Sequence, residues 1–307
     1  MVTTNINKNE CIVRIKSADA RHCIGSGVLY TEENLGDRVY LLTAAHCLFE
    51  DADTFNVLRN GIVVDVFSTV NKKYEEVVVL DLCHNAVMLT EKTNDLAVVV
   101  LEKHIIDSLC PNLPVVKIVT TNADVNEIIA LGFPKANNHQ EVFTARTTWL
   151  NERVGTKQFV LQCETDLIED YAGGFSGGGL FLQVNREILL MGIFARFLME
   201  ERGRQIYGQS FVDLNSLLVS KNLPEITFGY IGDGGLTEAL VNSNVCQSIA
   251  NLGPNFNPDL NLRTNIHKYM DAIIRNRRYR KELFKALDEW LNDLKFYGNI
   301  STCDDPI

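Results

Sequence analysis

A serine set among glycines is the first feature of this sequence that could do chemistry. Ser176 lies in the run Gly-Gly-Phe-Ser-Gly-Gly-Gly, residues 173–179. Glycines adopt backbone conformations that are costly for other residues, so several N–H groups can point to one place. Acyl transfer needs an exposed hydroxyl beside such donors, because an oxyanion develops next to the nucleophile. A glycine-rich turn alone does not define a site, so its partners decide the interpretation.

Two upstream motifs supply the residue types that a serine nucleophile requires. His46 lies in Leu-Thr-Ala-Ala-His-Cys, residues 42–47, and Asp95 lies in Asn-Asp-Leu-Ala-Val-Val-Val, residues 94–100. A serine hydroxyl is a weak nucleophile until a neighbouring base takes its proton. Imidazole is such a base, and a carboxylate on its other nitrogen fixes its tautomer and stabilises the imidazolium. The order His46, Asp95, Ser176 therefore predicts a triad assembled by folding.

These motifs resemble those of the trypsin-like (chymotrypsin-fold) serine peptidases. Residues 25–30, Gly-Ser-Gly-Val-Leu-Tyr, match a strand of that family, and residues 190–195, Leu-Met-Gly-Ile-Phe-Ala, look like its strand beside the bound peptide. The resemblance extends over residues 10–220. The Gly-Ser-Gly strand and residues 128–134 are more similar to bacterial and intracellular branches, which include the high-temperature-requirement proteases.

The resemblance implies a role for each motif residue. His46 would be the general base, Asp95 would orient it, and Ser176 would attack the scissile carbonyl. The backbone N–H groups of Gly174 and Ser176 would form the oxyanion hole. Secreted digestive members carry an aspartate just before the serine, where it pairs with a freshly cleaved N-terminus. This chain has Phe175 at that position, so that activation route is not open to it.

The resemblance also suggests residues that select the substrate. In that family an acid six positions before the serine forms the floor of the specificity pocket and selects Lys or Arg. Asp170 has this spacing; the alternative is a solvated loop acid within the acidic run 166–170. Ala195 lies on the strand expected beside the substrate, Phe197 just past it could narrow the pocket, and Arg196 could pair with Asp170.

Short apolar runs separated by turn residues dominate the first two-thirds of the chain, and this pattern favours strands. We expect a mostly β fold of two antiparallel, six-stranded-type β-barrels of the chymotrypsin-like kind, over residues 1–113 and 114–223. A cleft between two barrels is a favoured place for a ligand. The runs are residues 11–15, 27–30, 39–43, 61–67, 77–82 and 96–101, then 115–119, 127–132, 142–150, 159–163, 179–184, 188–194 and 209–212.

The pattern then changes to helical spacing, with apolar residues such as Leu236, Leu240 and Ile249 recurring on one face. This predicts a small α-helical C-terminal module, residues 224–307, for docking or regulation. Its core is marginal at roughly 80 residues, so we expect it to dock on something. Residues 252–262 resemble a linker that joins effector domains to sensor ATPases in bacterial antiviral systems; the alternative is a Pro/Asn-rich turn between helices.

Composition restricts the partners and the compartment. A net charge of -10 argues against nucleic acid as the main partner, so the basic residues 275–281 favour a solvated helix face or an acidic protein partner. Residues 1–10 lack an apolar signal core, and no apolar stretch is long enough to span a bilayer, so we expect a cytoplasmic protein without membrane contact. Eight cysteines without metal-type spacing favour free thiols and no metal site. The resemblance to secreted relatives leaves a bridge between Cys23 and Cys47 open.

Histidines outside the His46 motif are expected to be surface or core residues, since none belongs to a comparable motif. They are His22, His84, His104, His139 and His267.

The main hypothesis is a serine endopeptidase that cleaves protein substrates through an acyl-enzyme, without metal or cofactor. Unrestricted trypsin-like activity in the cytosol would be harmful, so we expect a latent enzyme, controlled through oxyanion-hole disorder or the helical tail. A sensor ATPase or another regulatory protein is the expected partner, which would make the chain an antiviral defence effector. The alternative is a pseudoprotease whose cleft binds a peptide or protein without cutting it.

Overall fold

The structure is a computed structural model. It describes residues 8–91, 93–121, 128–135, 138–152, 157–163, 173–184, 187–197 and 205–231. The chain forms two compact units, residues 1–120 with 124–229, and residues 121–123 with 230–307. The described residues belong almost wholly to the first unit, and the expected helical module lies outside them from residue 232 onward.

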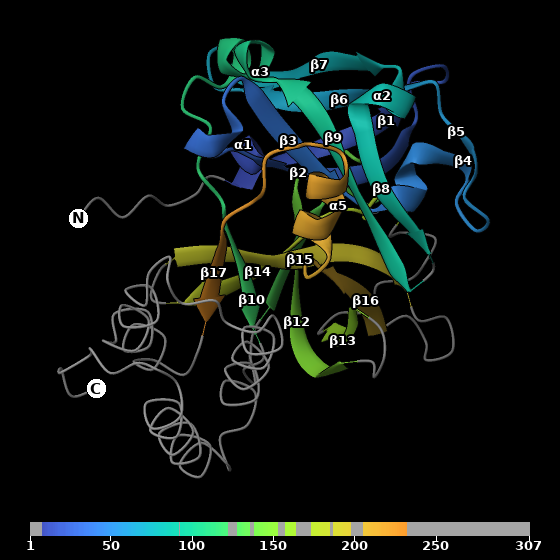
Figure 1. Ribbon diagram of the computed structural model, residues 1–307, viewed down its shortest axis with the longest axis vertical. Helices are drawn as coiled ribbons and strands as arrows, with labels where there is room; N and C mark the ends of the chain where they lie inside the picture. The colour runs from blue at the N-terminus through green and yellow to red at the C-terminus, as the bar shows by residue number, and fades with distance from the viewer. Residues whose placement is uncertain are drawn as a thin grey trace, which may run out of the picture. The chain divides into compact units, whose positions relative to one another are not determined.

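Seven strands form the first sheet, in the order β7-β6-β1-β2-β3-β9-β8, with every neighbouring pair antiparallel (Figure 1). Short helices and a two-stranded ribbon, β4–β5, connect these strands. The strands are β1 Ile12–Ser17, β2 Cys23–Tyr30, β3 Arg38–Thr43, β6 Gly61–Ser68, β7 Lys73–Leu80, β8 Ala86–Glu91 and β9 Asn94–Glu102. The connecting elements are α1 Lys8–Cys11, η1 Glu33–Leu35, η2 Ala45–Leu48, β4 Phe49–Asp51, β5 Asn56–Leu58, α2 Leu82–Asn85 and α3 Lys103–Leu109.

The second sheet contains a closed six-stranded barrel. Its order is β14-β11-β12-β13-β16-β15-β10-β17, and an additional β14–β15 pairing closes the first six strands into a ring. Strand β10 joins β15 in parallel. The elements are β10 Lys117–Thr121, β11 Ile128–Gly132, β12 Phe143–Glu152, β13 Gln158–Cys163, β14 Gly179–Val184, β15 Glu187–Phe197, β16 Gln205–Ser210, α5 Leu214–Ser220 and β17 Phe228–Ile231.

The mostly β fold expected from the sequence is confirmed. Three local expectations were wrong. The run 77–82 ends as a strand at Leu80, since Leu82 begins helix α2, and the run 209–212 ends at Ser210. The first sheet also has a seventh strand, β8, which was not expected although its residues 86–89, Ala-Val-Met-Leu, are apolar.

A shared core joins the two sheets. Successive residues of a strand point to opposite faces, so a strand buried on both faces contributes to two cores. On β3, Leu41 belongs to the core inside the first sheet, whereas Leu42 belongs to a cluster that also contains Phe181 and Ile193 of the second sheet. The strands at the centre of the first sheet are therefore fixed against the barrel that follows them.

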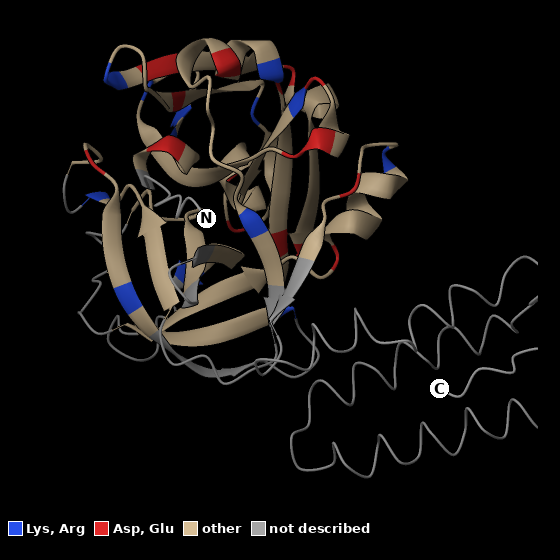
Figure 2. Cartoon of the chain, turned by 90° about the vertical axis from the view of Figure 1, so that its left-hand side faces the viewer, with Lys and Arg blue, Asp and Glu red and all other residues tan. Residues whose placement is uncertain are grey.

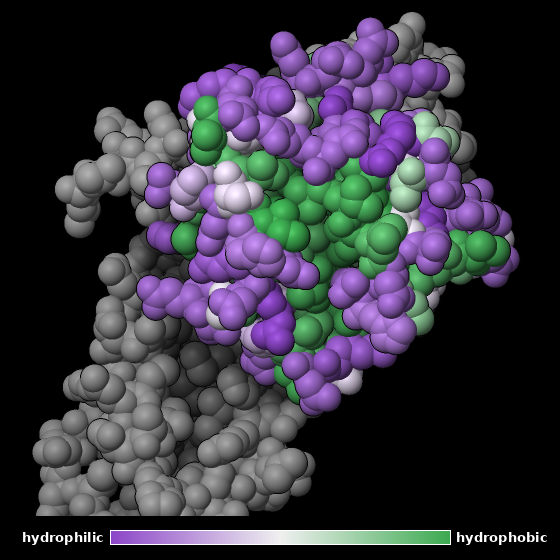
Figure 3. Space-filling view, turned by 90° about the horizontal axis from the view of Figure 1, so that it is seen from above, coloured by the Kyte–Doolittle hydropathy of each residue, from purple (hydrophilic) through white to green (hydrophobic). Residues whose placement is uncertain are grey.

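Charge and hydrophobicity are unevenly distributed over the surface. Charged residues of both signs are interspersed over the first sheet and its helices, whereas few lie on the described strands of the second sheet (Figure 2). Seen from above, over the first sheet, hydrophobic residues gather at the centre of the face and hydrophilic residues surround them (Figure 3). Val78 and Leu80 of β7 are more than half exposed, at 52% and 59%.

We expect Leu42→Ala to lower the free energy of unfolding by about 2–5 kcal/mol, because it leaves a cavity in the core that both sheets share. Leu80→Ala is the matched control; this exposed side chain should change the free energy by no more than about 0.5 kcal/mol. Chemical denaturation of the three proteins measures both values. Equal values for the two variants would contradict a core common to both sheets.

Candidate active site

Two neighbouring strands bring His46 and Asp95 together. Strand β3 ends at Thr43, and the 3-10 turn η2 that carries His46 follows at once. Strand β9 begins at Asn94, and its Ala97 pairs with Thr43 in antiparallel register. The end of one strand thus lies beside the start of the other, which explains how residues 46 and 95 meet.

The His46 ring is hydrogen-bonded to the Asp95 carboxylate. His46 Nδ1 lies 2.6 Å from Asp95 Oδ2, and the backbone N–H of His46 donates to Asp95 Oδ1 at 3.0 Å. The exposed fractions of the two side chains are 16% and 7%. Because an ionised carboxylate only accepts hydrogen bonds, Nδ1 carries the proton and Nε2 is left to take another.

The environment of His46 changes its affinity for a proton. Burial by itself lowers the pKa of His46, because it disfavours the charged ring, while the Cys47 sulfur and the Asp95 carboxylate act in the opposite direction. The net effect raises the pKa of His46 well above the ordinary histidine value. The arrangement therefore favours an imidazolium once a proton has been accepted.

Gln209 fixes the backbone at Asp95, a role that the sequence did not reveal. This side chain of β16 is fully buried, and its Oε1 accepts the Asp95 N–H at 3.2 Å. Its Nε2 donates to Asn94 Oδ1 at 3.1 Å, and Asn94 Nδ2 in turn donates to Asp213 Oδ2 at 3.0 Å. The second sheet thus holds the start of β9. Strand β16, Gln-Ile-Tyr-Gly-Gln-Ser, is itself largely polar, so the sequence does not single out this glutamine.

Ser176 lies in the loop between β13 and β14, next to the His46 turn. Its carbonyl accepts the Ser26 N–H at 2.7 Å and lies 3.6 Å from the Cys47 sulfur. Cys47 directly follows His46 in the chain. The Ser176 backbone therefore lies beside the turn that carries His46, and His46 in turn contacts Asp95.

Phe175 anchors the loop that carries Ser176. Its side chain is fully buried, and its ring makes edge contacts with Phe194 at 5.1 Å and Phe143 at 6.4 Å between centroids. The loop is tied to the barrel just after Ser176, because the Gly177 N–H donates to the Phe194 carbonyl at 2.8 Å. Ser176 itself is only partly buried. An apolar anchor thus occupies the position where secreted relatives carry an aspartate.

Two glycines of this loop have conformations and surroundings that exclude a side chain. Gly174 has φ +90°, and a Cβ there would lie 2.7 Å from the Phe133 carbonyl oxygen. Gly177 has φ +81°, and a Cβ there would lie 2.1 Å from Thr43 Oγ1. Among the described residues, none accepts a hydrogen bond from the N–H of Gly174 or Ser176. Within the described part of the chain, both N–H groups are therefore without an acceptor.

The residues expected to select the substrate are only partly described. Asp170 lies outside the described residues, and of Phe197 only its place at the end of β15 is given. Ala195 is fully buried and packs with Val160 and Tyr207. The Arg196 guanidinium stacks on the Tyr207 ring at 5.2 Å, and it makes no ion pair within the described part of the chain.

The thiols and acidic side chains of the described residues are a second possible source of reactivity or metal binding. The six cysteines among the described residues are free thiols, including Cys23 and Cys47. Burial raises the pKa of Cys23 to about 12, so this thiol is not a ready thiolate. Over the same residues, no group of three or more His, Cys, Asp or Glu side chains could hold a metal ion. Nor does any helix of the described segments have the length and apolar character to cross a membrane.

Comparison with known proteins identifies a family for most of the described chain. Residues 25–191, more than half of the 307 residues, match the trypsin-like peptidase domain. No curated protein matches the chain.

Several solved structures match the chain at low sequence identity. The active form of the Rv3671c protease from M. tuberculosis is 14% identical, with 72% of this chain and 84% of that one covered and a TM-score of 0.45. The thermostable serine protease AL20 from an extremophilic microorganism is 17% identical, with 66% of this chain and 90% of that one covered and a TM-score of 0.47. The protease Anisep from Arthrobacter nicotinovorans is 15% identical, with 69% of this chain and 95% of that one covered and a TM-score of 0.49.

We expect Asp95→Asn to lower the pKa of His46, because it removes the carboxylate that stabilises the charged ring. An NMR titration of the His46 ring protons measures the change. Asp81→Asn is the control, since Asp81 accepts a comparable contact from His84 at 2.7 Å on the surface and should leave His46 unaffected. A His46 titration that is the same in all three proteins would contradict the coupling.

Proposed function

The chain belongs to the trypsin-like peptidase domain family and is a serine endopeptidase, and we propose that it cleaves proteins through an acyl-enzyme formed on Ser176. The observation that carries this proposal is the 2.6 Å contact between His46 Nδ1 and Asp95 Oδ2 beside the Ser176 loop. Family membership favours this enzyme over the alternative, a pseudoprotease that binds a peptide without cutting it.

In the proposed reaction Ser176 Oγ attacks the scissile carbonyl carbon while His46 Nε2 accepts the hydroxyl proton. Asp95 keeps the Nδ1 proton in place and stabilises the imidazolium. The N–H groups of Gly174 and Ser176 donate to the carbonyl oxygen as it becomes negative. His46 then gives its proton to the leaving amine, the C–N bond breaks, and water repeats the sequence to release the acid and restore Ser176.

We keep the preference for Lys or Arg at the cleavage site as part of the proposal. It rests on the spacing between Asp170 and Ser176 and on the family resemblance.

We expect Ser176→Ala to reduce turnover by about 10⁴ to 10⁶, since the nucleophile is lost while binding remains. Labelling with a fluorophosphonate and cleavage of unfolded casein measure the loss. Ser216→Ala is the control, because this exposed serine of α5 lies in none of the motifs of the proposed site. Equal labelling or equal cleavage by the wild type and Ser176→Ala would refute the assignment.

We further propose that the enzyme is latent, and that a sensor ATPase or another regulatory protein releases it through the helical module expected in residues 224–307, of which residues 228–231 form strand β17 instead. The support is the resemblance of residues 252–262 to a linker of bacterial antiviral systems; these residues lie outside the described ones. In this proposal the protein acts in the cytoplasm as a defence effector.

Latency predicts that the isolated chain leaves unfolded casein intact, and that cleavage begins when the right partner is added. The measurement is casein cleavage by the chain alone and by the chain mixed with ATPases encoded beside it. The Ser176→Ala comparison is made with the partner present if the isolated chain is silent. Steady cleavage by the isolated wild type would contradict latency.

A further inference from the structure

A turn of the second sheet lies directly against Gly174. The His139 ring carbon Cε1 and nitrogen Nδ1 both lie 2.7 Å from the place where a Cβ of Gly174 would be. His139 Nδ1 lies 2.8 Å from the Phe133 carbonyl, and since a carbonyl only accepts, this nitrogen donates its proton to it. The Gly174 backbone is therefore bounded on this side by the ring of His139 and by the carbonyl of Phe133.

Hydrogen bonds to the same turn orient the peptide between Gly173 and Gly174. The Lys135 N–H donates to the Gly173 carbonyl at 2.8 Å. In a trans peptide the carbonyl and the following N–H point in opposite directions, so this bond directs the Gly174 N–H away from the turn. The Ser26 hydroxyl holds the next carbonyl, that of Gly174, at 2.7 Å. The direction of the Gly174 N–H thus depends on where the 133–140 turn lies.

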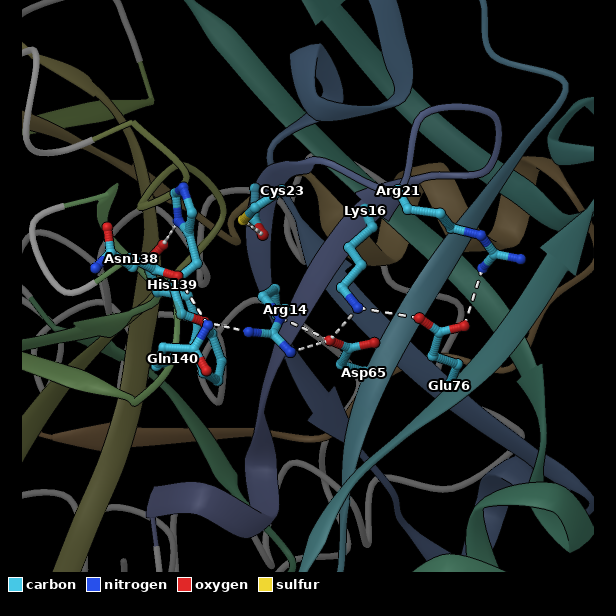
Figure 4. Close-up of polar contacts among 11 residues, drawn as sticks. Arg14, Lys16, Arg21, Cys23, Asp65, Glu76, Asn138, His139 and Gln140 are labelled. Carbon is cyan, nitrogen blue, oxygen red and sulfur yellow. Dashed lines mark hydrogen bonds and ion pairs between the residues drawn. The ribbon is translucent and has the colours of Figure 1, made fainter.

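One arginine of the first sheet holds this turn. Arg14 of β1 donates from Nη1 to the His139 carbonyl and from Nε to Asp65 Oδ2, the second at 2.6 Å (Figure 4). The side chains of Arg14 and Asp65 are only 13% and 2% exposed. Charge-assisted bonds from a planar guanidinium fix the direction as well as the distance, so Arg14 ties the His139 backbone to a buried anion.

The rest of the charged cluster keeps the Asp65 carboxylate in place. Lys16 Nζ lies 2.8 Å from Asp65 Oδ2 and 3.1 Å from Glu76 Oε1, and Arg21 reaches the same Glu76 at 3.2 Å (Figure 4). The cluster runs from Arg21 on the surface to Arg14 beside the turn. Within this cluster of described residues, Arg14 donates to the His139 carbonyl, whereas Arg21 donates to the exposed Glu76.

We propose that Arg14 and His139 are positioning residues for the oxyanion donor Gly174. Arg14 holds the 133–140 turn on the first sheet, and His139 with Lys135 sets the direction of the Gly174 N–H. This inference rests on the proposed function, because it assigns the turn a role in stabilising the oxyanion. Neither residue touches the reacting atoms.

Amide hydrogen exchange at Lys135 tests the first step whether or not the chain is active. Lys135 N–H is protected by the Gly173 carbonyl, so a released turn should exchange it about tenfold faster in Arg14→Ala and His139→Ala. Arg14→Lys keeps a positive charge beside Asp65, so this variant keeps the test valid if Arg14→Ala fails to fold. It cannot reach Asp65 and His139 together, so we expect the same direction of change.

Turnover tests the second step, under the condition in which the wild type cleaves. Arg14→Ala and His139→Ala should lower kcat at least about tenfold with KM within about twofold, since the interaction is made mainly in the transition state. The acid limb of the pH profile should not move, because the contact between His46 and Asp95 is untouched. Arg21→Ala, at the far end of the same cluster, should change neither exchange nor kcat.

An unchanged exchange rate at Lys135 in Arg14→Ala, or an unchanged kcat in His139→Ala, would overturn the inference. If Arg21→Ala lowers kcat as much as Arg14→Ala does, the inference is also overturned, because the loss would then be a general effect of the charged cluster. If the wild type shows no labelling that depends on Ser176 even with its partner present, the proposed function fails instead, and the exchange rates still decide whether Arg14 holds the turn.

Discussion

Every polar group of one buried serine, Ser26, is hydrogen-bonded, and two of these bonds hold the nucleophile loop on the first sheet. Its N–H donates to the Ser176 carbonyl at 2.7 Å, and its hydroxyl donates to the Gly174 carbonyl at 2.7 Å while accepting the Phe133 N–H at 2.8 Å. Its carbonyl accepts the Thr43 hydroxyl at 2.7 Å. The residue is fully buried, so each of these groups would be costly to leave unpaired. The loop therefore cannot leave β2 without losing several hydrogen bonds at once.

This constraint explains why the site can be built from distant parts of the chain. The shared core fixes the two sheets against each other, and the hydrogen bonds of Ser26 then set the nucleophile loop in register with the His46 turn. Gln209 does the corresponding work from the second sheet, since it holds the backbone of Asp95. Each sheet thus positions a residue whose motif belongs to the other. The geometry of the site depends on the contacts between the two sheets more than on either sheet alone.

The sequence predicted the parts of the site that local chemistry marks. The contexts of His46, Asp95 and Ser176 are short motifs, and short apolar runs separated by turn residues predicted most strands. It did not predict the residues that support them, because their partners are remote. Arg14 and His139 are 125 positions apart, and Asp95 and Gln209 are 114 apart. Such pairs depend on the tertiary register, which no local pattern records; His139, for example, was expected to be an ordinary surface or core histidine.

The same contacts indicate where a latent form of this enzyme would differ from an active one. Separating His46 from Asp95 would leave a largely buried carboxylate without its partner, which costs several kcal/mol in comparable pairs, roughly 3–5. Rotating the peptide between Gly173 and Gly174 would break the neutral hydrogen bond from the Lys135 N–H to the Gly173 carbonyl, which is worth about 1 kcal/mol net. Gly174 itself tolerates either sign of φ. A regulator therefore needs far less free energy to act on the oxyanion donor than on the base. If the proposed latency is built into this fold, the Gly173–Gly174 peptide is the place where the least costly change would silence the chemistry.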